Sequence, residues 1–255
     1  MEEMFIENGE KRLKAFVYCS SNRRAVIMCH GFSGNSSGIF GPELAQSLSN
    51  SNLVCRFDFS GQGESSGRFY DTSISTELAD LDIIVRYVRE TYTPQNIILL
   101  GHSFGAAIAI LYATQHSVDG VISLSGEGDL KKALDIEFSA KQQKELEEKG
   151  EVRFQNWSKE GDEDLLGRQF YDDMKRYNTL RAAREISGPV LYIHGKSDEE
   201  IPYSASEEMY RQGGKNRELA IVEDANHIYN WFSENKKITE MTKVINSWLE
   251  KNFKK

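Results

Sequence analysis

Short apolar runs and longer amphipathic segments alternate along this chain. Six runs are rich in Val, Ile and Leu and are bounded by polar residues or glycine, as is typical of strands covered on both faces of a sheet. These expected strands lie at residues 25–29, 53–57, 97–100, 121–124, 190–193 and 219–222. Residues 11–18 alternate only in part, and this pattern predicts an edge strand.

Segments with helical periodicity separate these strands. They lie at residues 42–49, 75–92, 105–115, 203–212 and 238–252. In the second of them, Leu81, Ile84 and Val88 recur on one face and form an amphipathic stripe. Strands that alternate with helices predict an α/β fold with a doubly wound, mostly parallel sheet.

The alternation breaks across residues 128–187. This segment shows no buried-strand pattern, and residues 141–151 are nearly all charged or polar, yet aromatic residues are scattered through it. We interpret it as a helical cap, or lid, inserted over one end of the sheet. Residues 1–127 and 188–255 would then form the core.

Size, charge and cysteine usage narrow the class of protein. The 255 residues fit one domain with an insertion, and the net charge of −8 without a Lys/Arg cluster argues against nucleic acid as a partner. No apolar run approaches the roughly 18 residues of a membrane helix, and the acidic N-terminus lacks the regions of a signal peptide. Cys19, Cys29 and Cys55 form an odd set without C-x-x-C spacing, which favours free thiols in a cytoplasmic protein over a disulfide framework or a zinc site.

The stretch Gly101-His102-Ser103-Phe104-Gly105 carries the clearest chemical signal. It follows an apolar run and precedes an Ala-rich helical segment, so that a Ser lies at a strand-to-helix turn with Gly two residues to either side. This pattern is typical of a nucleophile elbow, in which the glycines permit a sharp turn that exposes the Ser hydroxyl. A glycine-rich turn that only connects two elements is the alternative.

A Ser hydroxyl becomes a nucleophile when a base takes its proton and an acid orients that base. Asp198 follows the last-but-one expected strand, and His227 follows the last. Both residues therefore stand on loops at the carboxyl ends of strands, where open α/β sheets place their sites. The order predicts a Ser103–His227–Asp198 triad. Glu199 and Glu200 compete for the role of the acid, and Asp198 could instead serve only a turn.

Acyl transfer also needs hydrogen-bond donors for the oxyanion. The backbone N–H of Phe104, directly after Ser103, is one candidate. The loop His30-Gly31-Phe32-Ser33-Gly34 follows an expected strand and should supply the second, for which the sequence favours the N–H of Phe32.

The remaining histidines and glycines have simpler interpretations. We expect His30, His102 and His194 to hydrogen-bond locally and hold turns, and His116 to lie on the surface. The glycine-rich loop at residues 58–65 lacks the lysine of a phosphate-binding loop, so a structural role beside the pocket is favoured.

Five motifs occur along the chain in a recognisable order. They are His30-Gly31-Phe32, Asp58-Phe59-Ser60-Gly61-Gln62-Gly63-Glu64-Ser65, Gly101-His102-Ser103-Phe104-Gly105, His194-Gly195 with Asp198 and Pro202, and Asn226-His227. Across about residues 25–250 this order resembles the α/β-hydrolase superfamily, within its esterase, lipase and serine-peptidase-like group. The insertion is similar to the lid of microbial cinnamoyl (feruloyl) esterases and of monoacylglycerol lipases.

At two positions the chain differs from families that it otherwise resembles. Cinnamoyl esterases usually carry Gln after the nucleophile, whereas this chain carries Phe104. Haloalkane dehalogenases and epoxide hydrolases use Asp where this chain has Ser103. The resemblance therefore implies the α/β-hydrolase fold and a serine enzyme.

The expected activity is hydrolysis of small to medium acyl or aryl carboxylic esters through an acyl-enzyme, with no metal and no organic cofactor. The cap aromatics Phe138 and Trp157 are candidates for lining the acyl pocket. Thioester, amide or peptide cleavage would use the same triad, and a ligand-binding receptor of this fold is the alternative outside enzymes. The expected partner is a small-molecule ester, and the expected state is a monomer or a homodimer.

Overall fold

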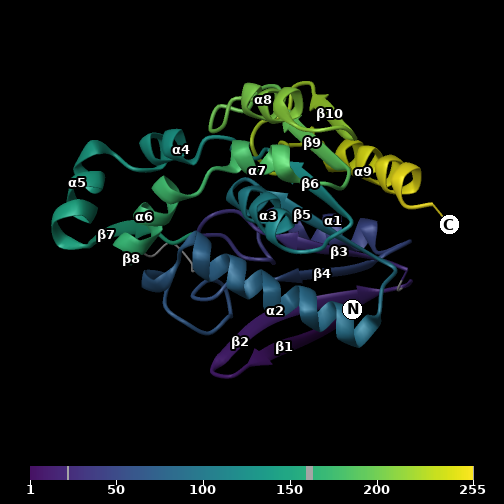
Figure 1. The fold of residues 1–255 in the computed structure, drawn as a ribbon, viewed down its shortest axis with the longest axis horizontal. Helices are drawn as coiled ribbons and strands as arrows, with labels where there is room; N and C mark the ends of the chain where they lie inside the picture. Colours follow the sequence, from purple (N-terminus) through teal and green to yellow (C-terminus); the bar gives the residue numbers. More distant parts are fainter. Residues whose placement is uncertain (22, 159–162, 255) are drawn as a thin grey trace.

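An eight-stranded sheet runs through the protein (Figure 1), in a computed structural model that describes residues 1–21, 23–158 and 163–254. Its strand order is β1-β2-β4-β3-β5-β6-β9-β10. The strands are β1 (Glu2–Asn8), β2 (Lys11–Cys19), β3 (Arg24–Cys29), β4 (Leu53–Phe57), β5 (Asn96–His102), β6 (Gly120–Leu124), β9 (Val190–Gly195) and β10 (Arg217–Val222). Every pairing from β4 to β10 is parallel, which confirms the doubly wound, mostly parallel sheet.

The antiparallel end of the sheet corrects one expectation. Residues 11–18 were expected at the edge, but β2 pairs with β4 on one side and with β1 on the other, so β1 is the edge strand. Among the seven residues of β1 only Ile6 is buried, and it packs into the core from a strand that is otherwise exposed or half-exposed. A single buried position gives no alternating pattern from which a strand could be predicted.

Helices cover both faces of the sheet. They are α1 (Gly41–Leu48), α2 (Ile74–Tyr92), α3 (Phe104–Gln115), α8 (Ser204–Gln212) and α9 (Ile238–Asn252), with a short 3₁₀ turn at Phe69–Asp71. Cys55 and Leu99 face the core shared with α2, α3 and α8, whereas Val54 and Leu100 face the core shared with α1 and α9. In the described ranges, no helix combines the length and the apolar composition that a membrane crossing needs.

Most of the segment between β6 and β9 lies at one end of the molecule, away from the C-terminus, whereas its last helix packs beside α3 (Figure 1). It contains α4 (Leu130–Glu137), α5 (Ala140–Lys149), β7 (Glu151–Gln155), β8 (Glu163–Gly167), α6 (Arg168–Arg176) and α7 (Thr179–Glu185), while residues 159–162 lie outside the described part. Strands β7 and β8 form an antiparallel pair, which the polar sequence of the segment did not predict. The sequence-based interpretation as a purely helical insertion therefore missed a two-stranded sheet.

Candidate active site

Ser103 lies at the sharp turn between β5 and α3, with backbone angles φ 55° and ψ −122°. A positive φ at a residue other than glycine costs about 1–3 kcal/mol and persists where its surroundings impose it. Here they do so sterically. A Cβ atom at Gly101 would overlap the carbonyl oxygen of Gly105, and one at Gly105 would overlap the carbonyl oxygens of Cys29 and His30 at the end of β3.

Asp198 forms the centre of a buried hydrogen-bond network. Its Oδ2 accepts from Nδ1 of His227 at 2.8 Å and from Nε2 of His194 at 3.0 Å. Its Oδ1 accepts from the backbone N–H groups of Glu200 and Ile201 at 3.0 and 2.9 Å. Burial alone would raise the pKa of Asp198, but the hydrogen bonds from His194 and His227 outweigh it and hold the pKa well below its usual range. The carboxylate is therefore ionised, and it is Asp198 that accepts from Nδ1 of His227.

The bond to Asp198 determines the tautomer of His227. Because Nδ1 donates to the carboxylate, Nε2 carries no proton in the neutral ring and can accept one. Burial lowers the pKa of His227, yet the hydrogen bond and charge of Asp198, with a smaller contribution from Glu200, raise it above its usual value. Glu200 Oε2 lies 3.8 Å from Nε2. The carboxylates of Asp198, at Nδ1, and Glu200, near Nε2, thus both stabilise the protonated form of the His227 ring.

Two other histidines support this network, and for one of them the expectation of a local role was wrong. His102 Nε2 donates to the backbone carbonyl of His227 at 3.0 Å, so it joins the elbow to a loop 125 residues further along the chain. Burial lowers the pKa of His102 to about 3, and the ring stays neutral. His194 donates from Nε2 to Asp198 and to the Ile201 carbonyl, and its Nδ1 accepts from the Ser206 hydroxyl.

The loop after β3 lies against the elbow and carries Phe32. His30 holds this loop, because its Nε2 accepts from the Phe59 N–H at 3.1 Å and its Nδ1 therefore donates to the Gly31 carbonyl. Phe104 is the first residue of α3, so its N–H has no acceptor within the helix. The rings of Phe32 and Phe104 pack edge to face at 5.7 Å. The two expected oxyanion donors thus belong to residues in direct contact.

A cavity of about 520 Å³ opens beside Ser103 and His227. The other side chains that line it come from β3, β4, β5, the loop after β3, the segment between β6 and β9 and the loops after β9 and β10. Glu200, which the sequence left as an alternative to Asp198 for the acid, is one of them. Those without any role in the sequence-based site include Met28, Ile39, Phe40, Arg56, Leu100, Glu137, Phe154, Ile228 and Phe232. They are scattered along the chain without a common motif. Only the fold brings them together.

The two aromatic residues that the sequence suggested for the pocket, Phe138 and Trp157, occupy different places. Trp157 lines the cavity and is 70% exposed, so it lies at the rim. Phe138 is buried behind the cavity, where its ring lies 5.1 Å from that of Phe154 and 5.9 Å from that of Phe170. Phe138 therefore supports Phe154, which is itself part of the lining.

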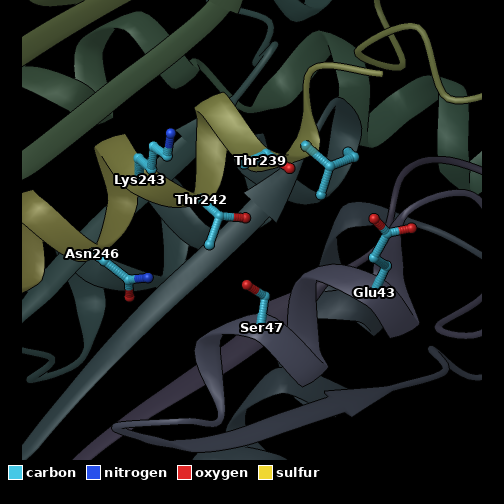
Figure 2. A pocket seen from close by; sticks show the side chains of 7 residues that line it. Glu43, Ser47, Thr239, Thr242, Lys243 and Asn246 are labelled. Atoms are coloured by element: carbon cyan, nitrogen blue, oxygen red, sulfur yellow. The ribbon is translucent and has the colours of Figure 1, made fainter. Parts of the chain in front are cut away.

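A second, smaller hollow of about 250 Å³ lies between α1 and α9 (Figure 2). Its labelled side chains are polar, and Ser47 on α1 faces Thr242 on α9 across it. It shares no lining residue with the larger cavity. Across the described residues, no three His, Cys, Asp or Glu side chains are arranged to hold a metal ion. Ser103 and His227 line the larger cavity, so we place the candidate active site there.

The strand order, the strained Ser after β5, and the acid and His after β9 and β10 define a member of the α/β-hydrolase superfamily. Residues 20–161 match the Hydrolase_4 family, described as serine aminopeptidase, S33, and the chain belongs to that family.

Solved structures share the fold over nearly the whole chain. Est1E from Butyrivibrio proteoclasticus, determined with bound ferulic acid, superposes with a TM-score of 0.82 at 21% identity and covers 99% of this chain and 100% of its own. Mouse α/β hydrolase domain-containing protein 10 superposes with a TM-score of 0.76 at 21% identity and covers 98% of this chain and 99% of its own.

Curated relatives are more similar in sequence over a shorter span. The uncharacterized protein YfhR of Escherichia coli O157:H7 is 26% identical over 204 residues, which are 80% of this chain but only 62% of YfhR. The mouse mitochondrial palmitoyl-protein thioesterase ABHD10 is 28% identical over 209 residues, which are 79% of this chain and 68% of the relative. The chain thus spans about three fifths of the YfhR protein that it matches.

The contact between the elbow and β3 predicts a large effect of Gly105→Ala. The added methyl group would overlap two backbone carbonyls that cannot rotate away, so we expect the free energy of unfolding to fall by about 3 kcal/mol or more. Urea denaturation followed by circular dichroism measures this change. Gly214→Ala is the control, because its Cβ would make only ordinary contacts at 3.6 and 3.9 Å and should change the stability by less than about 0.5 kcal/mol. Equal stability of the two variants would contradict the steric account.

The charge beside His227 predicts that Glu200→Gln lowers the pKa of this histidine. A neutral side chain near Nε2 removes a favourable interaction with the imidazolium and leaves the neutral ring unaffected. An NMR titration of the His227 ring resonances measures the pKa directly. Glu199→Gln is the matched control, since Glu199 is an exposed neighbouring carboxylate that does not line the cavity. An identical titration of His227 in wild type and Glu200→Gln would refute the prediction.

Proposed function

We propose that this protein is a serine carboxylic ester hydrolase that acts through an acyl-enzyme, with Ser103 as nucleophile, His227 as base and Asp198 as the acid that orients it. The proposal rests on the 2.8 Å bond from His227 Nδ1 to Asp198 and on the cavity that both His227 and Ser103 line. Membership in a serine hydrolase family supports it.

The reaction follows from the protonation states. In the first step Ser103 Oγ forms a bond to the ester carbonyl carbon while its proton passes to Nε2 of His227. The resulting imidazolium is stabilised by Asp198, and it returns the proton to the alcohol oxygen as the carbon–oxygen bond to the leaving group breaks. Water then attacks the acyl carbon and gives its proton to His227. As the bond from this carbon to Ser103 Oγ breaks, His227 returns the proton to Oγ, and the carboxylic acid leaves.

The backbone N–H groups of Phe32 and Phe104 are the proposed donors to the oxyanion. Loss of one such donor raises the barrier by about 3–4 kcal/mol in measured cases, so their alignment contributes a large share of the rate enhancement. The rings of both residues also contact Phe170 of α6, at 4.4 and 5.4 Å. The proposed donors are therefore held in part by the inserted segment.

We propose that residues 128–187 form a cap over the core made by residues 1–127 and 188–255, and that Trp157 and Phe154 of this cap contact the substrate. Both side chains line the cavity, and a volume of about 520 Å³ suits small to medium acyl or aryl esters.

Thioester hydrolysis is the second candidate. The curated relative ABHD10 carries the name of a palmitoyl-protein thioesterase, and the acyl-enzyme step is the same for an oxygen or a sulfur leaving group. The two candidates differ in the preferred leaving atom. Parallel assays with butyl esters and thioesters of the same acid would establish which of them the enzyme prefers.

Ser103→Ala tests the nucleophile. With short 4-nitrophenyl esters we expect wild type to show burst kinetics or steady turnover, and the variant to lose activity by about 10³-fold or more, because no acyl-enzyme can form. A fluorophosphonate probe should label wild type at Ser103 and leave the variant unlabelled. Ser47→Ala, which removes a hydroxyl from the small hollow of Figure 2, is the control and should keep full activity. Equal rates for wild type and Ser103→Ala, or no ester hydrolysis by either, would reject the proposed function.

A further inference from the structure

Arg56 is a buried cation in the wall of the catalytic cavity. It lies on β4, is only 5% exposed, and lines the same cavity as Ser103 and His227. Arginine is almost never this deeply buried unless it is paired with a carboxylate or another anion. No step of the proposed esterase mechanism involves Arg56.

Within the described part of the chain, Arg56 donates hydrogen bonds to neutral oxygens alone. Its Nε donates to the Tyr18 hydroxyl at 3.2 Å, and its Nη1 donates to the Ser36 carbonyl at 2.9 Å and to the Ser37 hydroxyl at 3.0 Å. Among the residues that the structure describes, no carboxylate lies within ion-pair distance of the guanidinium. The hydrogen bonds of Arg56 to these residues use Nε and Nη1, and no carboxylate accepts one from Nη2. Asp58 follows on the same strand end, but its two oxygens accept from the backbone N–H groups of Ser36 and Glu64.

The surroundings of Arg56 hold the guanidinium in one orientation. Its Cζ lies 3.8 Å from the centre of the Phe16 ring, which covers one face, and the loop at Ser36 and Ser37 fixes one edge. A planar guanidinium group that is already held in place loses little entropy when an anion binds to its remaining N–H groups. This arrangement suits a carboxylate or a similar oxyanion at the end of the cavity.

The sheet gives the separation between this cation and the nucleophile. Met28 of β3 is in register with Arg56 on one side and with Leu100 on the other, so Arg56 lies two strand spacings from β5. Ser103 follows Leu100 by three residues, which places the two Cα atoms roughly 14 Å apart. Met28, Leu100 and Phe40 line the cavity and provide apolar surface between them. An arginine side chain and an acyl chain of several carbons together span this gap.

Charge at the other side of the site gives the substrate its direction. Glu137 and Glu200 line the cavity, and Glu200 lies beside Nε2 of His227. An anionic leaving group near His227 would be repelled by these carboxylates, whereas an anion at the end of the acyl chain would reach Arg56. The positive charge of Arg56 and the negative charges of Glu137 and Glu200 therefore favour the same orientation of the substrate.

We infer that Arg56 is a specificity-determining residue that binds an anionic group at the far end of the acyl chain, so that the preferred substrates are half-esters of dicarboxylic acids. This inference rests on the proposed function for the position of the scissile bond. The binding of the anion itself does not depend on catalysis, and the experiment separates the two.

The kinetic test compares matched substrates. We expect wild type to hydrolyse 4-nitrophenyl half-esters of adipic to azelaic acid about 10- to 100-fold more efficiently, as kcat/KM, than the neutral esters of equal chain length, which is the range for a charge-assisted hydrogen bond. Arg56→Met should lose this preference, because its loss of kcat/KM on the half-esters should exceed its loss on the neutral esters by the same factor, about 10- to 100-fold. Arg56→Lys should restore part of the preference. Equal losses on both substrate series, or a wild type without any preference for the anion, would overturn the inference.

A binding test works without turnover. In Ser103→Ala, isothermal titration calorimetry should show that the methyl half-ester of a dicarboxylic acid of the preferred length binds more tightly than the neutral methyl ester of equal chain length, and Arg56→Met in this background should abolish the difference. The corresponding ω-phosphonate ester distinguishes the sources of the anion, since tighter binding of the phosphonate than of the half-ester would assign the site to a phosphorylated acyl group. Equal affinity for the half-ester and the neutral ester rejects the anion site even if Arg56→Met fails to fold. An anion preference in this assay combined with no ester hydrolysis by wild type rejects only the proposed function.

Discussion

The close approach of the elbow to the end of β3 is the contact on which the candidate site depends. Gly101 and Gly105 have no room for a side chain, and this lets the turn at Ser103 keep its positive φ while it packs against Cys29 and His30. The same approach brings the loop after β3 next to the first turn of α3. A looser elbow would relax the strained Ser103 and separate the N–H groups of Phe32 and Phe104, which we propose as the oxyanion donors.

Aromatic packing extends this constraint to the inserted segment. The Phe32 ring lies 5.7 Å from Phe104, 4.4 Å from Phe170 and 5.0 Å from Phe154, so it joins the loop after β3 to the elbow, α6 and β7. This contact also explains Phe104, the position at which the chain departs from cinnamoyl esterases. The Phe32 and Phe170 rings stack on each other at 4.4 Å, and Phe104 packs beside both, so a glutamine there would bury its amide against two aromatic rings. Phe104 therefore helps to attach α6 to the elbow.

Local patterns were sufficient for those parts of the site that follow strands. The buried runs and glycine motifs identified the loops of Ser103, Asp198 and His227, and the fold brings Asp198 and His227 into contact. Long-range partners could not be predicted in this way. The bond from His102 to the His227 carbonyl joins residues that are 125 positions apart in the sequence. Arg56 occupies a buried position of an otherwise apolar strand, where the sequence pattern predicts only a residue packed in the core. Such roles depend on which strands are neighbours, and the strand order is set by the whole fold.

The carboxylates around His227 differ in kind, and this difference bears on both proposals. Asp198 is buried and accepts four hydrogen bonds, so it determines the tautomer and orientation of the ring. The Glu200 side chain is 68% exposed, so solvent and salt screen its charge, and it adjusts the basicity of His227 without orienting the ring. Arg56 is 5% exposed in the wall of the same cavity, so its charge is screened less than that of Glu200. Attraction of an anionic acyl chain to Arg56 would therefore outweigh its repulsion by Glu200, and this difference favours one orientation of the substrate.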